Sequence, residues 1–357
     1  MKRIFVFATV MALLGAFLAP VTSFGATAVQ AGRGSTYTVT VGYENAATGA
    51  LIQSYFPEVV TIHVGDTVHW VQGSHEIHTV TFLAGAPAPD LIVPNASSPS
   101  GAEISPVAAF SERPADGKWD GTYFVNSGIM SLDKPFPTSW DLTFTVAGTY
   151  DYFCIVHGQA MSGKVVVLPA DQAVPSPAAT VALAAKELTA AKAGINDAFT
   201  AAEALAAKYP PTPNADGSTN YHVMIGYSTA DGKIDLMRFF PSSLNVRQGD
   251  MVYWFYGPME GMGGTSMAPH TITFYNGTPD QGLTIPGTLF INPMLFAPSA
   301  AFNPTQGALT RNGFYNSGVL EPGQSWNIKI GAILGVIKYE CALHDTSGMD
   351  AQLVVTR

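Results

Sequence analysis

The strings Cys154-Ile155-Val156-His157 and Cys341-Ala342-Leu343-His344 stand near the ends of two halves of the chain, and Met161 and Met349 follow them. Each string brings a thiol, an imidazole and a thioether into one tight loop. Soft sulfur and imidazole donors suit copper, and a trigonal site of two His and one Cys with a weak axial Met accommodates both Cu(I) and Cu(II). Each loop supplies three of these four ligands, so each needs one further His.

A His that could complete each set lies well upstream of the loop. His78 belongs to Glu76-Ile77-His78-Thr79-Val80-Thr81-Phe82, and His270 belongs to Ala268-Pro269-His270-Thr271-Ile272-Thr273-Phe274. In both stretches the apolar residues alternate, which predicts a β-strand. The candidate metal ligands are therefore His78, Cys154, His157 and Met161 in the first set and His270, Cys341, His344 and Met349 in the second.

Further short matches, in the same order in both halves, indicate an internal repeat. The matched pairs are Val41-Gly42-Tyr43 with Ile225-Gly226-Tyr227, Tyr55-Phe56-Pro57 with Phe239-Phe240-Pro241, and Asn126-Ser127-Gly128 with Asn316-Ser317-Gly318. Each series ends with the Cys loop and a last apolar run. A repeat of this kind indicates that one structural unit has been duplicated. We expect residues 35–169 and 216–357 to form two similar domains.

The composition favours a protein built of β-strands. The chain of 357 residues has room for two domains of ordinary size and a linker. Charged residues make up only 12%, and 35 Gly and 25 Pro supply the turns that short antiparallel strands require. Period-2 runs over residues 36–41 and 326–330 predict strands. Before each Cys, alternate residues share one strand face, namely Tyr150, Tyr152 and Cys154 or Ile337, Tyr339 and Cys341.

Other uses of these residues have to be weighed. A lone buried Cys is usually a small hydrophobic residue, and a lone His on an apolar face is usually a hydrogen-bonded core residue. A disulfide between Cys154 and Cys341 is a further alternative. The chain has two Cys in all, and both stand in the same motif with a matching His upstream. A disulfide would leave the repeated His and Met unexplained, so the repeat favours two metal sites.

Each half resembles the cupredoxins, the blue copper family of plastocyanin and azurin. The resemblance covers nearly all of the chain except the leader and the central linker. The second loop has the plastocyanin spacing Cys-x2-His-x4-Met, whereas the first, Cys-x2-His-x3-Met, is one residue shorter. Both Met stand four residues before the final apolar run, which starts at Val165 or Leu353. Met161 is therefore kept as an axial ligand beside Met349.

This resemblance implies an all-β fold of two Greek-key β-sandwich domains joined by an Ala-rich helical linker, with one type 1 copper ion in each domain. Thr79 and Thr271 stand where plastocyanins often carry Asn, and a hydroxyl there could tie the His strand to the Cys loop. In the family, the solvent-side His of the Cys loop passes electrons to partners. The resemblance thus implies an electron carrier with a redox protein partner such as a cytochrome or a copper oxidase.

Residues 170–215 differ in composition from both halves and are predicted to be a helical linker. Ser176 before Pro177 is a helix start signal, and the Ala-rich run that follows has high helix propensity. Val181, Leu188 and Ile195 recur every seven residues with Ala between them, which gives a narrow apolar seam. The seam could pack on a domain or pair with another chain. A semi-rigid spacer is the default interpretation, because an Ala-rich seam adheres weakly.

Residues 1–28 have the pattern of an export signal. Lys2-Arg3 precede an apolar run from Ile4 to about Val21, and Ala26-Thr27-Ala28 is a cleavage site of small residues. Export predicts a periplasmic or extracellular (cell-surface) location, and the absence of spare Cys fits thiols reserved for metal. The run approaches the length of a membrane span, so a retained anchor and association with a membrane surface stay open.

The net charge of -9 bears on the partners of the protein. It disfavours nucleic acid and suits a basic redox partner, although simple solubility explains it equally well.

Copper enzymes are the main alternative class of function. In the multicopper oxidases, which are also built of cupredoxin domains, a trinuclear oxygen-reducing cluster uses eight His beyond the type 1 ligands. This chain has eight His in all, four of them already assigned. A nitrite-reductase-like oxidoreductase needs three more His, but in that family one of them directly precedes the type 1 Cys. This chain has Phe153 and Glu340 at those positions. The remaining His63, His69, His75 and His222 form no repeated set, so we expect a carrier rather than an enzyme and keep the reductase as an alternative.

A copper storage or delivery protein is the second alternative, because it would share the ligands but exchange the metal readily. Met259, Met262 and Met267 lie in a Gly-rich insertion before His270 that has no counterpart in the first half. Thioethers bind Cu(I), so this insertion could receive or hand over copper. An adaptable apolar rim over the second site is the simpler interpretation.

Overall fold

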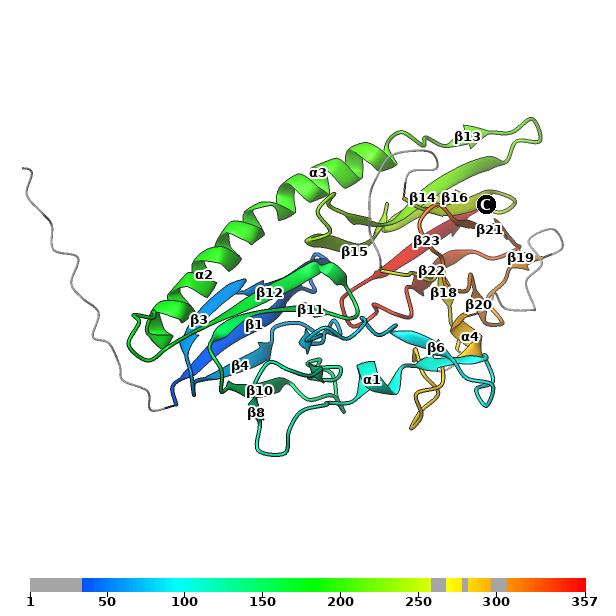
Figure 1. The fold of residues 1–357 in the computed structure, drawn as a ribbon. Helices are drawn as coiled ribbons and strands as arrows, with labels where there is room; N and C mark the ends of the chain where they lie inside the picture. The colour runs from blue at the N-terminus through cyan, green and yellow to red at the C-terminus, as the bar shows by residue number, and fades with distance from the viewer. Residues whose placement is uncertain (1–33, 258–267, 278–281, 297–306) are drawn as a thin grey trace, which may run out of the picture.

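The computed structural model describes residues 34–257, 268–277, 282–296 and 307–357 (Figure 1). The strands of the first half are β1 (Thr36–Asn45), β2 (Ala50–Phe56), β3 (Val59–His63), β4 (Thr67–Gln72), β5 (Thr81–Phe82), β6 (Ile92–Pro94), β7 (Ala102–Ile104), β8 (Lys118–Trp119), β9 (Val125–Asn126), β10 (Ser139–Phe144), β11 (Gly148–Cys154) and β12 (Gly158–Leu168). Those of the second half are β13 (Thr212–Pro213), β14 (Thr219–Ser228), β15 (Ile234–Phe240), β16 (Ser243–Arg247), β17 (Met251–Tyr256), β18 (Thr273–Phe274), β19 (Ala308–Leu309), β20 (Tyr315–Asn316), β21 (Ser325–Ile330), β22 (Gly335–Glu340) and β23 (Asp350–Thr356). The helices are α1 (Pro106–Ala109), α2 (Pro177–Ala193), α3 (Ile195–Ala206) and α4 (Pro293–Phe296).

Each half is a sandwich of two β-sheet layers. One layer runs β2-β1-β4-β10-β8 in the first half and β15-β14-β17-β21-β19 in the second. The other runs β3-β12-β11-β5-β9 in the first half and β16-β23-β22-β18-β20 in the second. Matching strands therefore occupy matching places in the two halves, and the predicted all-β sandwich is confirmed.

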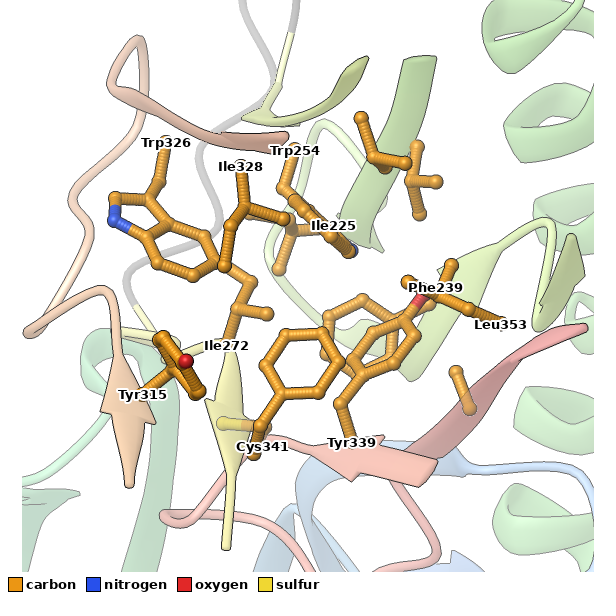
Figure 2. Close-up of a cluster of buried hydrophobic side chains, with 14 of the residues drawn as sticks. Ile225, Phe239, Trp254, Ile272, Tyr315, Trp326, Ile328, Tyr339, Cys341 and Leu353 are labelled. Carbon is orange, nitrogen blue, oxygen red and sulfur yellow. The ribbon is translucent and has the colours of Figure 1, made fainter. Parts of the chain in front are cut away.

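The core of each half lies between its two layers, because alternate strand residues point inward. In β1, Tyr37, Val39 and Val41 are 2%, 0% and 0% exposed, as the period-2 pattern predicts. The inward residues form one apolar cluster in each half, around Trp70 in the first and around Trp254 in the second. Figure 2 shows the second cluster, with Cys341 beside Tyr339 at the end of β22. Each fully buried aliphatic side chain contributes about 1.5–3 kcal/mol to folding.

The two halves share one continuous sheet of eleven strands. Within it β2 pairs antiparallel with β15, so that Ile52 lies opposite Ile234 and Ala50 opposite Leu236. All seven residues of β2 are buried, because its second face is covered as well. The junction also satisfies backbone groups that an open strand edge would expose to water.

The linker forms two helices that run end to end across the outside of this shared sheet (Figure 1). The predicted start is confirmed: the hydroxyl of Ser176 accepts a hydrogen bond of 3.2 Å from the backbone N–H of Ala179, and Pro177 begins α2. Helix α2 packs against β1 and β2, and α3 packs against β14 and β15.

Packing of the linker helices differs from the semi-rigid spacer that is the default interpretation of the sequence. Ala184 and Leu188 contact Ile52 and Phe56 of β2, so the apolar seam lies on the sheet. Val181 is 53% exposed and does not belong to the seam. The open alternative that the seam packs on a domain is therefore confirmed, and the default interpretation as a semi-rigid spacer is wrong, because the shared sheet offers the Ala-rich face an apolar surface.

A second contact joins the halves on the side away from the helices. The hairpin β6–β7 reaches residues 283–291, where the N–H of Ile104 donates to the carbonyl of Leu289 at 2.9 Å and the N–H of Ile291 donates to the carbonyl of Ala102 at 3.1 Å. Ile104, Ile129 and Ile291 form a small apolar cluster there. Contacts on two sides hold the ends of the two sandwiches together.

Two predicted features lie outside the described residues. They are the export signal at residues 1–28 and the insertion with Met259, Met262 and Met267. In the part of the chain that the structure describes, no helix combines the length and the apolar character that crossing a bilayer requires.

Candidate metal centres

Each predicted set of His and Cys is brought together at one end of its sandwich. The donor atoms of His78, Cys154 and His157 lie within 4.8 Å of one another, and so do those of His270, Cys341 and His344. In the first set, Sγ of Cys154 is 3.9 Å from Nδ1 of His78 and 3.4 Å from Nδ1 of His157. In the second set the corresponding distances from Sγ of Cys341 are 3.7 Å and 3.4 Å. Both sets thus aim two Nδ1 atoms at one sulfur.

These groups are buried, and burial sets their protonation. Cys154 and Cys341 are 0% exposed, and burial raises the pKa of each thiol to about 11, against backbone N–H groups that lower it. Burial lowers the pKa of His344 to about 4 and, together with the nearby His344, that of His157 to about 3. The pKa values of His78 and His270 are also lowered, mainly by burial. At neutral pH the rings are neutral and able to bind a metal, whereas each thiol must release its proton first.

One threonine in each half ties the His strand to the Cys loop. The N–H of Thr79 donates to Sγ of Cys154 at 3.4 Å, and its hydroxyl accepts from the N–H of Ile155 at 2.8 Å. Thr271 makes the same two bonds to Cys341 and Ala342, at 3.3 Å and 2.9 Å. The predicted hydroxyl tie is confirmed in both halves. Such bonds fix the direction of a ligand before the metal arrives.

A polar chain behind each threonine explains the repeated Asn-Ser-Gly string. In the first half the hydroxyls of Thr79 and Thr81 are 3.0 Å apart, and Thr81 donates to Oδ1 of Asn126 at 2.9 Å. The hydroxyl of Ser127 accepts from the N–H of Val80 at 2.8 Å. The second half repeats this arrangement with Thr271, Thr273, Asn316, Ser317 and Ile272. The sequence marked these residues as repeated but gave them no role.

Both Met occupy matching positions in the two sandwiches. Met161 and Met349 are 0% exposed and belong to the same apolar clusters as Cys154 and Cys341. Phe153 pairs with Ser162, and Glu340 pairs with Asp350. Ser162 and Asp350 are thus the strand partners of the residues directly before the two Cys. Met161 and Met349 each stand one residue before that partner. The shorter first loop is absorbed by an irregular pairing at Cys154, which faces Gly158.

A glycine lies against the upstream His in each half. Gly42 has φ +70 and Gly226 has φ +60, a region that side chains disfavour. A Cβ atom at either position would lie 2.6 Å from Nε2 of His78 or His270. The repeated Val41-Gly42-Tyr43 and Ile225-Gly226-Tyr227 strings thus leave space for the two rings.

The two metal sets face one another across a single carboxylate, that of Glu76. Its Oε1 lies 3.8 Å from Nε2 of His157, and its Oε2 lies 3.8 Å from Nε2 of His344. The pKa of Glu76 is raised to about 8, mainly by burial and then by the neighbouring Asp235 and Glu44, against a backbone hydrogen bond at Ile77 that lowers it.

This arrangement overturns one expectation and adds a residue that the sequence did not single out. His157 and His344 are 9% and 5% exposed, so the expectation of a solvent-side His in each loop is wrong. Contact between the two halves brings Glu76 of the first half against the ring of His344 in the second. The one signal for Glu76 in the sequence is that the matching position of the second half holds Ala268.

The four other His are engaged elsewhere. His69 Nδ1 is 2.7 Å from Asp141, His75 Nδ1 is 2.7 Å from Glu44, His63 Nε2 is 2.7 Å from the carbonyl of Gln172, and His222 stacks on Tyr253. Within the described ranges, the groups of His, Cys, Asp and Glu compact enough to hold a metal are the two sets above.

Solved structures of amicyanin are among those to which the chain is similar. No family model matches the chain, and no curated protein matches it. An oxidised methionine-to-leucine mutant of amicyanin is 24% identical, with a TM-score of 0.22 over 37% of this chain and 81% of that chain. A Cu(I) form of a proline-to-glycine mutant of amicyanin is 24% identical, with a TM-score of 0.23 over 40% of this chain and 90% of that chain. At these TM-scores the likeness assigns no function.

Proposed function

We propose that this protein is an exported type 1 copper protein with two centres that acts in electron transfer. The observation that carries the proposal is the pair of buried sets in which one thiol lies between the Nδ1 atoms of two imidazoles. When bound, copper supplies a one-electron couple between Cu(I) and Cu(II). The chain supplies the ligands and the frame that holds them.

The donor set fits copper better than the other common metals. A thiolate with two imidazoles and a buried thioether in the same cluster is the combination that suits type 1 copper. Structural zinc sites usually have four strong ligands, whereas each set here has three. The threonine bonds behind each set would hold the ligands in one arrangement for both oxidation states.

Placement of the two sets supports exchange of electrons within the chain. The rings of His157 and His344 point toward the same carboxylate, so the two centres would lie on either side of Glu76. Burial of both rings keeps water away from this span. A redox protein partner such as a cytochrome or a copper oxidase would dock at a surface other than these two ring edges.

The remaining parts of the proposal rest on the sequence and on the strand order. The matching order of strands in the two halves supports a duplicated cupredoxin-like unit. The pattern of residues 1–28 supports export to the periplasm or the cell surface. Sequencing the N-terminus of the mature protein tests the export signal, and an intact Met1 would count against cleavage.

Metal analysis with visible and electron paramagnetic resonance spectra of the purified chain tests the function. We expect two tightly held copper ions with the strong blue absorption of a copper–thiolate bond. A third copper with a non-blue signal would support the nitrite-reductase-like alternative. Weak or colourless binding would support copper storage or delivery instead.

A further inference from the structure

Glu76 occupies a position that belongs to both centres. It comes from the loop before His78 in the first half, yet its two oxygens lie at equal distances from one ring of each half. Its side chain is 9% exposed. Because Ala268 stands at the matching place in the second half, one carboxylate faces both metal sets.

A buried carboxylate is costly unless hydrogen-bond donors surround it. The neighbouring charged groups Asp235 and Glu44 are acids and offer no compensation. Among the described residues, the ion-pair partners of Glu76 are the rings of His157 and His344. Beyond the backbone hydrogen bond at Ile77, the ring N–H groups of His157 and His344 are the donors that would stabilise the ionised form of Glu76.

The geometry of each Cys loop determines which ring nitrogen faces Glu76. Nδ1 of each loop His lies 3.4 Å from the Sγ of the Cys, and Nε2 of the same ring faces Glu76. When Nδ1 accepts the S–H, the ring proton is on Nε2 and points toward Glu76. A metal bound at Nδ1 preserves this tautomer. A carboxylate behind a metal-binding His commonly fixes the ring and raises its basicity.

We propose that Glu76 is a positioning residue shared by the two centres: its two carboxyl oxygens accept the Nε2–H groups of His157 and His344, and it thereby sets the metal affinity of both. This inference rests on the proposed function and adds a link between the two sites. The separations of 3.8 Å exceed a direct hydrogen bond by about 0.7 Å, which a small side-chain movement closes.

Replacing Glu76 tests the proposal in the full chain. Glu76→Ala copies the second half and removes both acceptors, and Glu76→Gln keeps one acceptor oxygen at the same size. The Cys341→Ser and Cys154→Ser backgrounds isolate the first and the second centre. The control is Glu44→Gln, which removes a neighbouring carboxylate that binds His75 rather than a candidate ligand.

Competition with a Cu(I) chelator measures the affinity of each isolated centre. Because partners behind a ligand typically change metal affinity about 10- to 100-fold, we expect Glu76→Ala to weaken both centres by that factor. We expect Glu76→Gln to weaken at least one centre and Glu44→Gln to weaken neither. A loss confined to the first centre would show a local structural role, and no loss at either would equally overturn the proposal.

Nitrogen-15 NMR of the copper-free chain gives a second readout that needs no bound metal. We expect His157 and His344 to carry their protons on Nε2 in the native chain and both ring signals to shift in Glu76→Ala and Glu76→Gln. Rings protonated on Nδ1 in the native chain would refute the shared bond. If the native chain bound no copper, the proposed function would fail, while the ring signals would still decide the role of Glu76.

Discussion

Gly226 lies so close to His270 that no side chain fits between them. A Cβ atom at Gly226 would be 2.6 Å from Nε2 of the ring, which is closer than carbon atoms of real side chains approach a neighbour. The ring of His270 is 1% exposed and packs at 4.8 Å against the ring of Tyr256. Its direction toward Cys341 therefore depends on the missing side chain of Gly226.

Gly226→Ala is predicted to damage the second centre and to spare the first. The added methyl would push His270 away from Cys341, so we expect one of the two blue centres to be lost. Copper analysis with visible absorption measures this. The matched control is Gly249→Ala, which also has positive φ, +93, but has nothing within 4 Å of the new atom. Equal loss of colour in both variants would show that backbone strain alone is responsible.

Thr79→Val is predicted to destabilise the first half. The change removes the acceptor of the Ile155 N–H, which leaves a buried donor unsatisfied and costs about 1–3 kcal/mol. Urea unfolding measures the free energy of unfolding, and the spectrum of the first centre should change as well. Thr271→Val makes the same change beside Cys341, so it should alter the spectrum of the second centre instead. A Thr79→Val protein of native stability would argue against the tie.

Asp235→Asn is predicted to reduce the loss of stability as pH rises. Asp235 lies in β15 at the junction with β2, bonded to Ser228 and to Gln53, and burial raises its pKa from 3.8 to about 6. Because the folded state holds this proton more tightly, the free energy of unfolding falls as pH rises from about 4 to 6, by about 3 kcal/mol. Below pH 4 both states are protonated, so the contribution is constant there.

Urea unfolding of both proteins at several pH values measures this effect. We expect Asp235→Asn to gain up to about 3 kcal/mol relative to the native chain between pH 4 and pH 7. A difference between the two proteins that does not vary with pH would show that Asp235 has an ordinary pKa.

Much of each candidate centre could be predicted from the sequence because its residues recur in the same order. The two Cys loops, the upstream His and the tie through Thr79 and Thr271 all follow from local strings that occur twice. Strand alternation likewise predicted the inward face of β1. These features depend on contacts within one half, where spacing along the chain determines which side chains meet.

Contacts between the halves could not be predicted in this way. Strand β2 is buried throughout, so its sequence has no alternation that reports a partner, and its pairing with β15 has no local signal. Val181 fits the heptad spacing yet is exposed, because packing on the sheet rather than the spacing selects the buried helix face. The position of Glu76 between the two rings likewise depends on contact between the two halves, which no local string reports.

The two centres are predicted to have different midpoint potentials. Nε2 of His78 lies 3.1 Å from the hydroxyl of Ser74, whereas His270 packs against the ring of Tyr256. The Cys loops also differ by one residue. Because surrounding bonds and loop geometry tune a copper site, a redox titration followed in the visible region should show two separate transitions. A single transition, with both centres at one midpoint potential, would count against different potentials at the two centres.

Copper content and blue absorption of the single Cys variants test the central claim most directly. If the chain holds two independent type 1 centres, Cys154→Ser and Cys341→Ser should each retain one blue copper, and the double variant should retain none. The contradicting result is a native chain with no blue copper, or single variants that both keep the full absorption of the native protein.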